Sequence, residues 1–341
     1  MRPIRLEPNQ LHRFYRGGPA IARFRGTASE DDRAPEDWVG STTTVFGEPR
    51  RGLSVLPDGR LLRDAIAADP EGFLGPEHVD SYGADPMLLV KLLDAGERLP
   101  VHFHPDGAFA REHLGLSHGK TEAWVIVETR DKDPCVHLGF REEVDADTLA
   151  GWVAGQEDER MLAALNRLPV SPGDSVFVPA GLPHSIGRGV FLVELQEPSD
   201  LSVLLEWAGF GLDGSRDGHL GVGFELALEG IERSALDAGE LVRLHSSPGD
   251  WETLSGGVTR LLPVDADSYF RANALRPDPE LHLEPAFSIL VVLSGAGSLG
   301  TEHGGTLELR RGQTVLVPHA AGTATLTGEL SATHCIPPPP S

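Results

Sequence analysis

Several features that mark other protein classes are scarce in this 341-residue chain. Its two cysteines, Cys135 and Cys335, are too few for a disulfide scaffold and stand in no metal or redox spacing. No apolar run approaches the roughly 18–20 residues that span a bilayer. The N-terminal segment lacks the apolar core of a secretion signal. We therefore expect a protein of the reducing cytoplasm.

Positive charge is also scarce. Lysine and arginine number 29 against 51 acidic residues, which gives a formal net charge of −22. Lysine occurs at Lys91, Lys120 and Lys132 only. Such a field repels nucleic acid and anionic membrane surfaces, so neither is expected as a partner. An anionic substrate would need local positive charge in its pocket.

Short strand-like runs fill the spaces between the 40 glycines and 27 prolines. Examples are "EAWVIVE", "GVFLVELQ" and "FSILVVLSG", and closely spaced runs of this kind predict an all-β sandwich or barrel. Helical spacing interrupts them and predicts two short helices over about 145–154 and 157–166. A weaker helical pattern covers 61–75.

One segment of the chain is echoed later. "PGDSVFVPAGLPHSI" (172–186) resembles "RGQTVLVPHAAGTAT" (311–325), so that Gly173 matches Gly312 and Pro179 matches Pro318. Repetition at this distance predicts two similar β-domains in tandem. We place them at 1–225 and 226–341, with a helical insertion at about 145–168 in the first.

Histidines and a glutamate stand in an order that predicts a metal site. In "PVHFHPD", His102 and His104 are two residues apart, so on a strand both side chains face the same side. Glu122 heads the next strand, and His184 follows a sharp Pro-x-Gly-x-x-His bend typical of the cupin barrel. Imidazoles with one carboxylate suit Zn²⁺, Fe²⁺ or a similar divalent ion. Each piece alone is also compatible with an ordinary core or surface residue.

Other histidines near these motifs are not expected to bind metal. The second copy of the repeat has Ala320 and Thr323 where the first has Gly181 and His184, so a degenerate second domain without metal is predicted. His113 and His118 lie in a glycine-containing loop, where solvated side chains are the ordinary interpretation.

Four segments together resemble a known family. They are "FYRGGPAIARF", "VKLLDAGERLPVHFHPD", "GKTEAWVIVE" and "PGDSVFVPAGLPHSIGRGVFLVELQEPSD". They are similar to the class I mannose-6-phosphate isomerases in their short bacterial form, over residues 10–207 and more loosely beyond. The resemblance implies a mainly β, tandem double cupin with a small helical insertion. It also implies a zinc enzyme that interconverts an aldose phosphate and a ketose phosphate.

The resemblance assigns metal ligands. The family's Gln-x-His pair, glutamate and later histidine fall on His102, His104, Glu122 and His184. Histidine replaces the usual glutamine, so the implied set becomes three histidines and one glutamate. It would hold one divalent metal, with Zn²⁺ favoured and Fe²⁺ or Mn²⁺ as alternatives.

The resemblance also suggests groups that act on the substrate. Glu194 matches a pocket carboxylate and is the predicted catalytic base, with Asp200 in reserve. The family's lysines fall on Lys91 and Lys120. Lys120 is expected to bind substrate or handle a proton. Lys91 either binds substrate or forms a structural pair with a carboxylate.

Two departures concern phosphate and charge. Pro100 replaces a serine that helps the family to hold phosphate, and Leu204 stands near the position of the catalytic arginine. Arg188 or Arg216 is proposed as the substitute, with Arg188 assigned to substrate binding.

The sequence thus predicts a metal-dependent aldose–ketose isomerase that acts on a sugar or sugar phosphate through a cis-enediol. The reaction is expected to be most like the interconversion of mannose 6-phosphate and fructose 6-phosphate, with the metal polarising the carbonyl and a base moving the proton. Three alternatives stay open: an isomerase of an unphosphorylated sugar, another metal cupin enzyme such as a dioxygenase, and a non-catalytic sugar-binding cupin.

Overall fold

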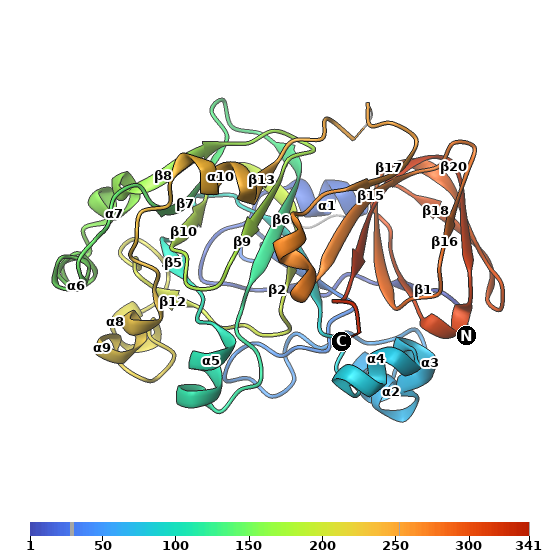
Figure 1. Ribbon diagram of the computed structural model, residues 1–341, viewed down its shortest axis with the longest axis horizontal. Helices are drawn as coiled ribbons and strands as arrows, with labels where there is room; N and C mark the ends of the chain where they lie inside the picture. Colours follow the sequence, from blue (N-terminus) through green and yellow to red (C-terminus); the bar gives the residue numbers. More distant parts are fainter. Residues whose placement is uncertain (28–30, 252, 341) are drawn as a thin grey trace.

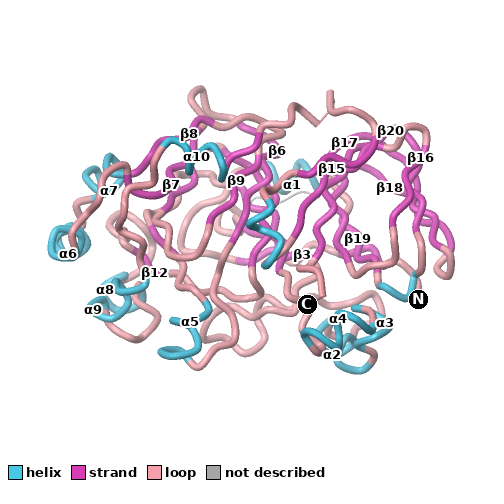
Figure 2. Tube along the Cα trace, viewed as in Figure 1, coloured by secondary structure: helices cyan, strands magenta, loops and turns pink. Residues whose placement is uncertain are grey.

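Antiparallel β-sheets dominate the protein (Figures 1 and 2). The structure is a computed structural model that describes residues 1–27, 31–251 and 253–340. Its strands form sheets of seven, five and eight strands, which confirms the expected mainly β class. None of the helices in the described ranges is long and apolar enough to cross a membrane.

The seven-stranded sheet runs through the centre of the molecule, in the order β13-β9-β6-β11-β4-β3-β2. In that order the strands are His245–Ser246, Ser175–Val178, Glu122–Thr129, Val190–Gln196, Leu89–Asp94, Glu36–Val39 and Gln10–Leu11. The runs that the sequence marked as strand-like therefore lie side by side, although they are far apart along the chain.

The five-stranded sheet packs against one face of the seven-stranded sheet. Its order is β12-β5-β10-β7-β8. The strands are Val203–Leu204, His102–Phe103, His184–Ile186, Cys135–Phe140 and Leu165–Pro169. Both sheets contribute to one apolar core, in which Trp124 and Leu192 of the larger sheet meet Leu138 and Ile186 of the smaller one.

The eight-stranded sheet forms the other half of the molecule, on the right in Figure 1. Its main path is β1-β19-β17-β20-β15-β14, with β16 on β20 and β18 on β17. The strands are Ile4–Leu6, Thr314–Val317, Ser288–Thr301, Ala324–Ile336, Arg271–Arg276, Gly257–Arg260, Glu280–Leu283 and Gly305–Arg310. Leu290, Leu299 and Leu326 lie in a core of this sheet.

The helices are short and lie around the sheets. The α-helices α1 to α10 are Ala20–Arg25, Leu62–Ala68, Pro70–Leu74, Pro76–Tyr82, Gly107–Phe109, Ala146–Gly155, Asp158–Ala164, Gly214–Asp217, Phe224–Ala227 and Ala238–Leu244. A π-helical turn at Ala110–Leu114 (η1) and 3₁₀ turns at Leu228–Gly230, Val264–Ser268 and His319–Ala321 (η2 to η4) complete the set.

The predicted helical insertion is present as α6 and α7. Asp145 caps α6, because its side chain accepts a hydrogen bond from the amide of Thr148. The second helix is shorter than predicted. It ends at Ala164, since Leu165 and Asn166 pair with β7 as the start of strand β8. The weaker pattern over 61–75 is also helical, as α2 and α3.

The predicted domain boundary at 225/226 stays a prediction. One strand from each side of this boundary pairs with a sheet on the other side. Strand β1 from the N-terminus pairs with β19, and β13 pairs with β9 of the first sheet. Phe24, Phe191 and Phe270 also share one apolar core across the two halves. The halves are therefore packed together through a continuous buried interface.

The internal echo corresponds to two tight turns that lead into β9 and β19. Gly173 and Gly312 have φ values of +97° and +86°, a region in which side chains are strained. A Cβ atom on Gly173 would lie 2.0 Å from the carbonyl oxygen of Gly249, and one on Gly312 would lie 1.8 Å from that of Phe24. Glycine is therefore required at both positions, because φ is positive and because another backbone segment leaves no room for a Cβ atom.

This geometry predicts unequal costs for two glycine substitutions in the eight-stranded sheet. Gly305 has a φ of +78°, but no described atom lies within 4 Å of its would-be Cβ. We expect Gly305→Ala to lower the free energy of unfolding by about 1–2 kcal/mol through φ strain alone. Gly312→Ala should cost about 1–3 kcal/mol more, because the backbone at Phe24 must move. Urea unfolding of both variants measures this, and equal losses would contradict the account.

Candidate metal centre and catalytic cavity

Three histidines converge where strands β5 and β10 pair. His102 lies directly opposite His184 in the strand register, and His104 follows two residues after His102. Their ring centroids are 4.2, 4.8 and 5.0 Å apart. One nitrogen of each ring lies within 4.8 Å of those of the other two, and all three residues are buried. The three could hold a metal ion.

The other nitrogen of each ring is held by the backbone. Nδ1 of His102 lies 2.8 Å from the backbone oxygen of Pro100, and Nδ1 of His104 lies 2.6 Å from that of Leu201. Nδ1 of His184 lies 2.8 Å from the backbone oxygen of Leu182. A nitrogen that faces a carbonyl oxygen must carry the proton, so Nε2 keeps its lone pair. Nε2 of His184 is buried without a hydrogen-bond partner among the described residues. Metal-binding histidines are oriented in this way.

Burial keeps these imidazoles neutral. It lowers the pKa of His102 well below the ordinary value, and the neighbouring His184 and His104 lower it further. Burial and the nearby Lys120 ammonium lower the pKa of His104 to about 3. The pKa of His184 is also lowered by burial. Neutral imidazole is the form that binds a metal.

Glu122 brings a carboxylate to the same point from the facing sheet. Its Oε2 lies 3.1 Å from Nε2 of His104, and its Oε1 lies 3.4 Å from Nε2 of His184. The indole of Trp124 donates a hydrogen bond to Oε1 at 2.9 Å. Three neutral nitrogens and one carboxylate fit a divalent ion such as Zn²⁺, Fe²⁺ or Mn²⁺.

Lys120 lies beside this cluster. Its ammonium group donates to Glu122 and approaches Nε2 of His104 at 2.8 Å. It is also 3.5 Å from Oε1 of Glu194. The predicted lysine therefore reaches both the metal-binding groups and the predicted base.

Lys91 pairs with Glu194 across the sheet. The strand register places the two residues opposite each other, and Nζ of Lys91 lies 3.3 Å from Oε1 of Glu194. Nζ is also 3.8 Å from Oε2 of Glu36 and 4.9 Å from the ring centre of Trp38. Lys91 thus has the carboxylate partners of a structural pair and also lines the cavity.

Glu194 carries a raised pKa, the opposite of its neighbour Glu122. Burial is the main cause, opposed by the charge of Lys91 and reinforced by that of Glu122. For Glu122, the cations and histidines around it outweigh burial and hold the pKa well below the ordinary value. Two carboxylates whose pKa values are pushed apart suit different roles, one as a ligand and one in proton transfer.

The guanidinium group in this cavity was not predicted from the sequence. Arg13, in the N-terminal segment, forms an ion pair with Asp200, with N–O distances of 3.2 and 3.3 Å. Its Nε is 3.2 Å from Oε1 of Glu36. Arg13 stands next to the family-like "FYRGG" motif, and this adjacency was the available signal. Only folding brings it to Asp200, 187 residues away along the chain.

The two arginines that the sequence suggested lie away from the cavity. Arg188 lies between β10 and β11, is 68% exposed and pairs with Asp131 at 3.0 Å. Arg216, 76% exposed, pairs with Asp217. Both are paired at the surface, so we do not assign either to the substrate. Pro100 and Leu204 do line the cavity, and neither side chain can donate a hydrogen bond.

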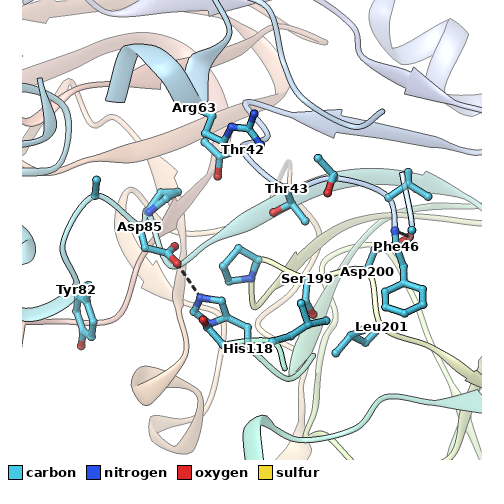
Figure 3. Close-up of a pocket in the computed structure, with 18 residues that line it drawn as sticks. Thr42, Thr43, Phe46, Arg63, Tyr82, Asp85, His118, Ser199, Asp200 and Leu201 are labelled. Atoms are coloured by element: carbon cyan, nitrogen blue, oxygen red, sulfur yellow. Dashed lines mark hydrogen bonds and ion pairs between the residues drawn. The ribbon is translucent and has the colours of Figure 1, made fainter. Parts of the chain in front are cut away.

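Two cavities share Asp200 as a lining residue. The inner cavity, of about 50 Å³, is lined by His102, His104, Lys91, Lys120, Arg13 and Glu194, among others. The outer cavity, of about 670 Å³, is lined by Thr42–Gly47, Arg63, Tyr82, Asp85, His118 and the 198–201 segment (Figure 3). Asp200 lines both.

Comparisons with known proteins find similarity to mannose-6-phosphate isomerases. No family model matches it. Mannose-6-phosphate isomerase of Streptococcus mutans is 26% identical over 334 residues, 96% of each chain. Mannose-6-phosphate isomerase ManA of Bacillus subtilis is 30% identical over 207 residues, which cover 60% of each chain.

Solved structures resemble the whole chain. The mannose 6-phosphate isomerase from Bacillus subtilis matches with a TM-score of 0.76 at 22% identity, over 98% of this chain and 99% of that one. A mannose 6-phosphate isomerase bound with zinc and yttrium matches with a TM-score of 0.71 at 16% identity, over 99% and 100%. These neighbours have the cupin fold, so the expected fold class is confirmed.

The buried pairing around Glu36 predicts acid sensitivity. Burial alone would raise the pKa of Glu36, but Arg13 and Lys91 outweigh it and lower the pKa to about 2. A carboxylate whose pKa is lowered in the folded state stabilises the protein at pH values above its ordinary pKa. This stabilisation is lost as the pH falls towards the folded-state pKa. Between pH 5 and pH 3, wild type should lose about 2 kcal/mol more unfolding free energy than Glu36→Gln. Urea unfolding at the two pH values measures this, and parallel losses would contradict it.

Proposed function

We propose, from the premise that this chain is a class I mannose-6-phosphate isomerase-like protein, that it is a metal-dependent aldose–ketose isomerase. The reaction would be most like the interconversion of mannose 6-phosphate and fructose 6-phosphate. One observation carries the proposal: three neutral histidines converge with Glu122, beside a second carboxylate of raised pKa. The relatives from Streptococcus mutans and Bacillus subtilis bear the name of this activity.

The metal would be held by His102, His104, Glu122 and His184. A divalent ion bound there would act as a Lewis acid on the substrate's carbonyl oxygen. Zn²⁺ is favoured among the ions that this donor set fits, since a structural neighbour of the chain is described as bound with zinc. The backbone carbonyls behind the imidazoles keep the Nε2 atoms aimed at one point.

Glu194 is the proposed base. Isomerisation through a cis-enediol moves one proton between C1 and C2, and a carboxylate with a raised pKa can accept and return it. Its neighbours Lys91 and Lys120 both approach its Oε1, at 3.3 and 3.5 Å, and hold the carboxylate in place. The buried position keeps bulk water away from the proton.

Lys120 and Arg13 supply positive charge within the cavity. The Lys120 ammonium lies between Glu122 and Glu194, where it can stabilise negative charge that develops on the enediolate oxygens. Arg13 takes the place proposed for Arg188 and orients Asp200 through two hydrogen bonds. Asp200 is thereby committed to a cation, which makes it a positioning residue at the boundary of the cavity.

The metal proposal predicts that activity and metal content fall together. His184→Ala should bind the ion more than about a hundredfold more weakly and lose turnover of mannose 6-phosphate to fructose 6-phosphate. His282→Ala, at an exposed position, serves as the control. Turnover and metal content are measured on the same samples. Full activity or undiminished metal in His184→Ala would refute the metal-centred proposal.

The assignment of Glu194 as the base predicts that activity can be lost while the metal is retained. Glu194→Gln keeps the shape and should retain the metal, but kcat should fall by about 10²–10⁴-fold because the proton acceptor is gone. Glu128→Gln, on the neighbouring strand and away from the cavity, is the matched control. A kcat within a few-fold of wild type would assign proton transfer to another group.

A further inference from the structure

The inner cavity cannot contain a whole sugar phosphate. Its volume is about 50 Å³, whereas small-molecule sites typically have about 300–1,000 Å³. Its cations are also engaged: Arg13 with Asp200, Lys91 with Glu194, and Lys120 with Glu122. The reacting carbons can approach the histidines, but a phosphate group must lie farther out.

The outer cavity begins at the boundary of the inner one. Asp200 lines both, and the backbone oxygen of Leu201, another outer lining residue, holds His104 at 2.6 Å. Its volume of about 670 Å³ lies within the range of about 300–1,000 Å³ typical of small-molecule sites. A substrate whose carbonyl end lies at the histidines would therefore extend past Asp200 into this space.

A buried hydroxyl in the outer cavity lacks a partner. Thr43 is 8% exposed, and its Oγ1 has no hydrogen-bond partner among the described residues. It stands in the run Thr42–Thr44 along one wall, facing the 199–201 segment across the cavity (Figure 3). A buried polar group without a partner costs free energy, and a ligand oxygen would relieve that cost.

Both carboxylates that line the outer cavity have cationic partners, whereas the one arginine in its lining has a weak acidic partner. Asp200 is committed to Arg13, and Asp85 accepts a hydrogen bond from Nε2 of His118 at 2.7 Å. Arg63, at the rim beside Thr42, makes a loose contact of 3.7 Å with Asp64 and no closer ion pair with any residue that the structure describes (Figure 3). Local positive charge is what an anionic ligand needs in a chain of net charge −22.

His118 balances the charge of Asp85 and brings an imidazole to the same cavity. The expectation that it is a solvated loop histidine is wrong, because its side chain is 16% exposed and bonded to Asp85. Burial lowers the pKa of His118, but the Asp85 carboxylate outweighs burial and holds the pKa above its ordinary value. The imidazolium form therefore persists to higher pH than in an unpaired histidine.

We propose that the outer cavity is the subsite for the substrate's phosphomonoester group, bound by the Arg63 guanidinium, the His118 imidazolium and the Thr43 hydroxyl. The subsite rests on the proposed isomerase function for the identity of the substrate. It explains how a chain with Pro100 in the inner wall can still take a phosphorylated sugar.

The decisive experiment removes the Arg63 charge. Arg63→Gln should raise KM for mannose 6-phosphate about tenfold with kcat within twofold, because a charge-assisted contact to the non-reacting end is lost. Arg60→Gln removes a nearby exposed arginine that pairs with Asp58 and should change neither parameter. An unchanged KM in Arg63→Gln would overturn the subsite.

Inorganic phosphate provides a readout that does not depend on catalysis. Calorimetric titration at fixed ionic strength should show binding to wild type and to Arg60→Gln. Arg63→Gln and the near-isosteric Thr43→Val should bind at least several-fold more weakly. Equal binding in all four proteins, or no binding to wild type, would overturn the subsite. Wild type that binds phosphate in this pattern but lacks isomerase activity would refute the proposed function and leave the subsite standing.

Discussion

The pairing of buried lysines with buried carboxylates is the constraint on which the rest of the site depends. Lys91 and Glu194 face each other across strands β4 and β11, and Lys120 connects Glu194 to Glu122. Burial of a charge is costly unless it is paired, and removal of one partner leaves the other uncompensated. Loss of one member therefore destabilises the others. The charged side chains can meet because alternate residues of a strand point to the same face of the sheet. Glu122 and Glu194 lie on the same face of the sheet as Trp124, which belongs to the core between the two sheets.

The site joins elements that would otherwise be independent. The three histidines come from the five-stranded sheet and the segment after it, whereas Glu122 comes from the seven-stranded sheet. A metal bound by all four would link the two sheets across their shared core. Their donor atoms are already aligned by backbone carbonyls and by the Trp124 indole, so little ordering is left for the ion to impose. Asp200, held by Arg13, lines both this polar centre and the wider outer cavity.

Much of the fold and part of the candidate site could be predicted, for identifiable reasons. A strand alternates its faces every two residues, so the spacing of His102 and His104 is enough to predict that their side chains point the same way. Helix α6 has apolar residues at helical spacing and a capping aspartate, and it begins within one residue of the prediction. Helix α7 was predicted too long, because pairing of Leu165 with β7 overrides the helical pattern there. The surface position of Arg188 could not be predicted either, because no sequence periodicity indicates which loop side chains point inward.

The sequence by itself determined what depends on local spacing: the mainly β class, the shared face of His102 and His104, and the turn glycines Gly173 and Gly312. The tertiary structure alone decided which distant groups meet. It brought Arg13 to Asp200 and set the hydroxyl of Thr43 in a cavity with Arg63 and His118. Local patterns report each residue's own backbone geometry and burial. Contacts between distant segments depend on how whole sheets and loops pack. Such packing produces no regular spacing of residues that could be recognised in the sequence.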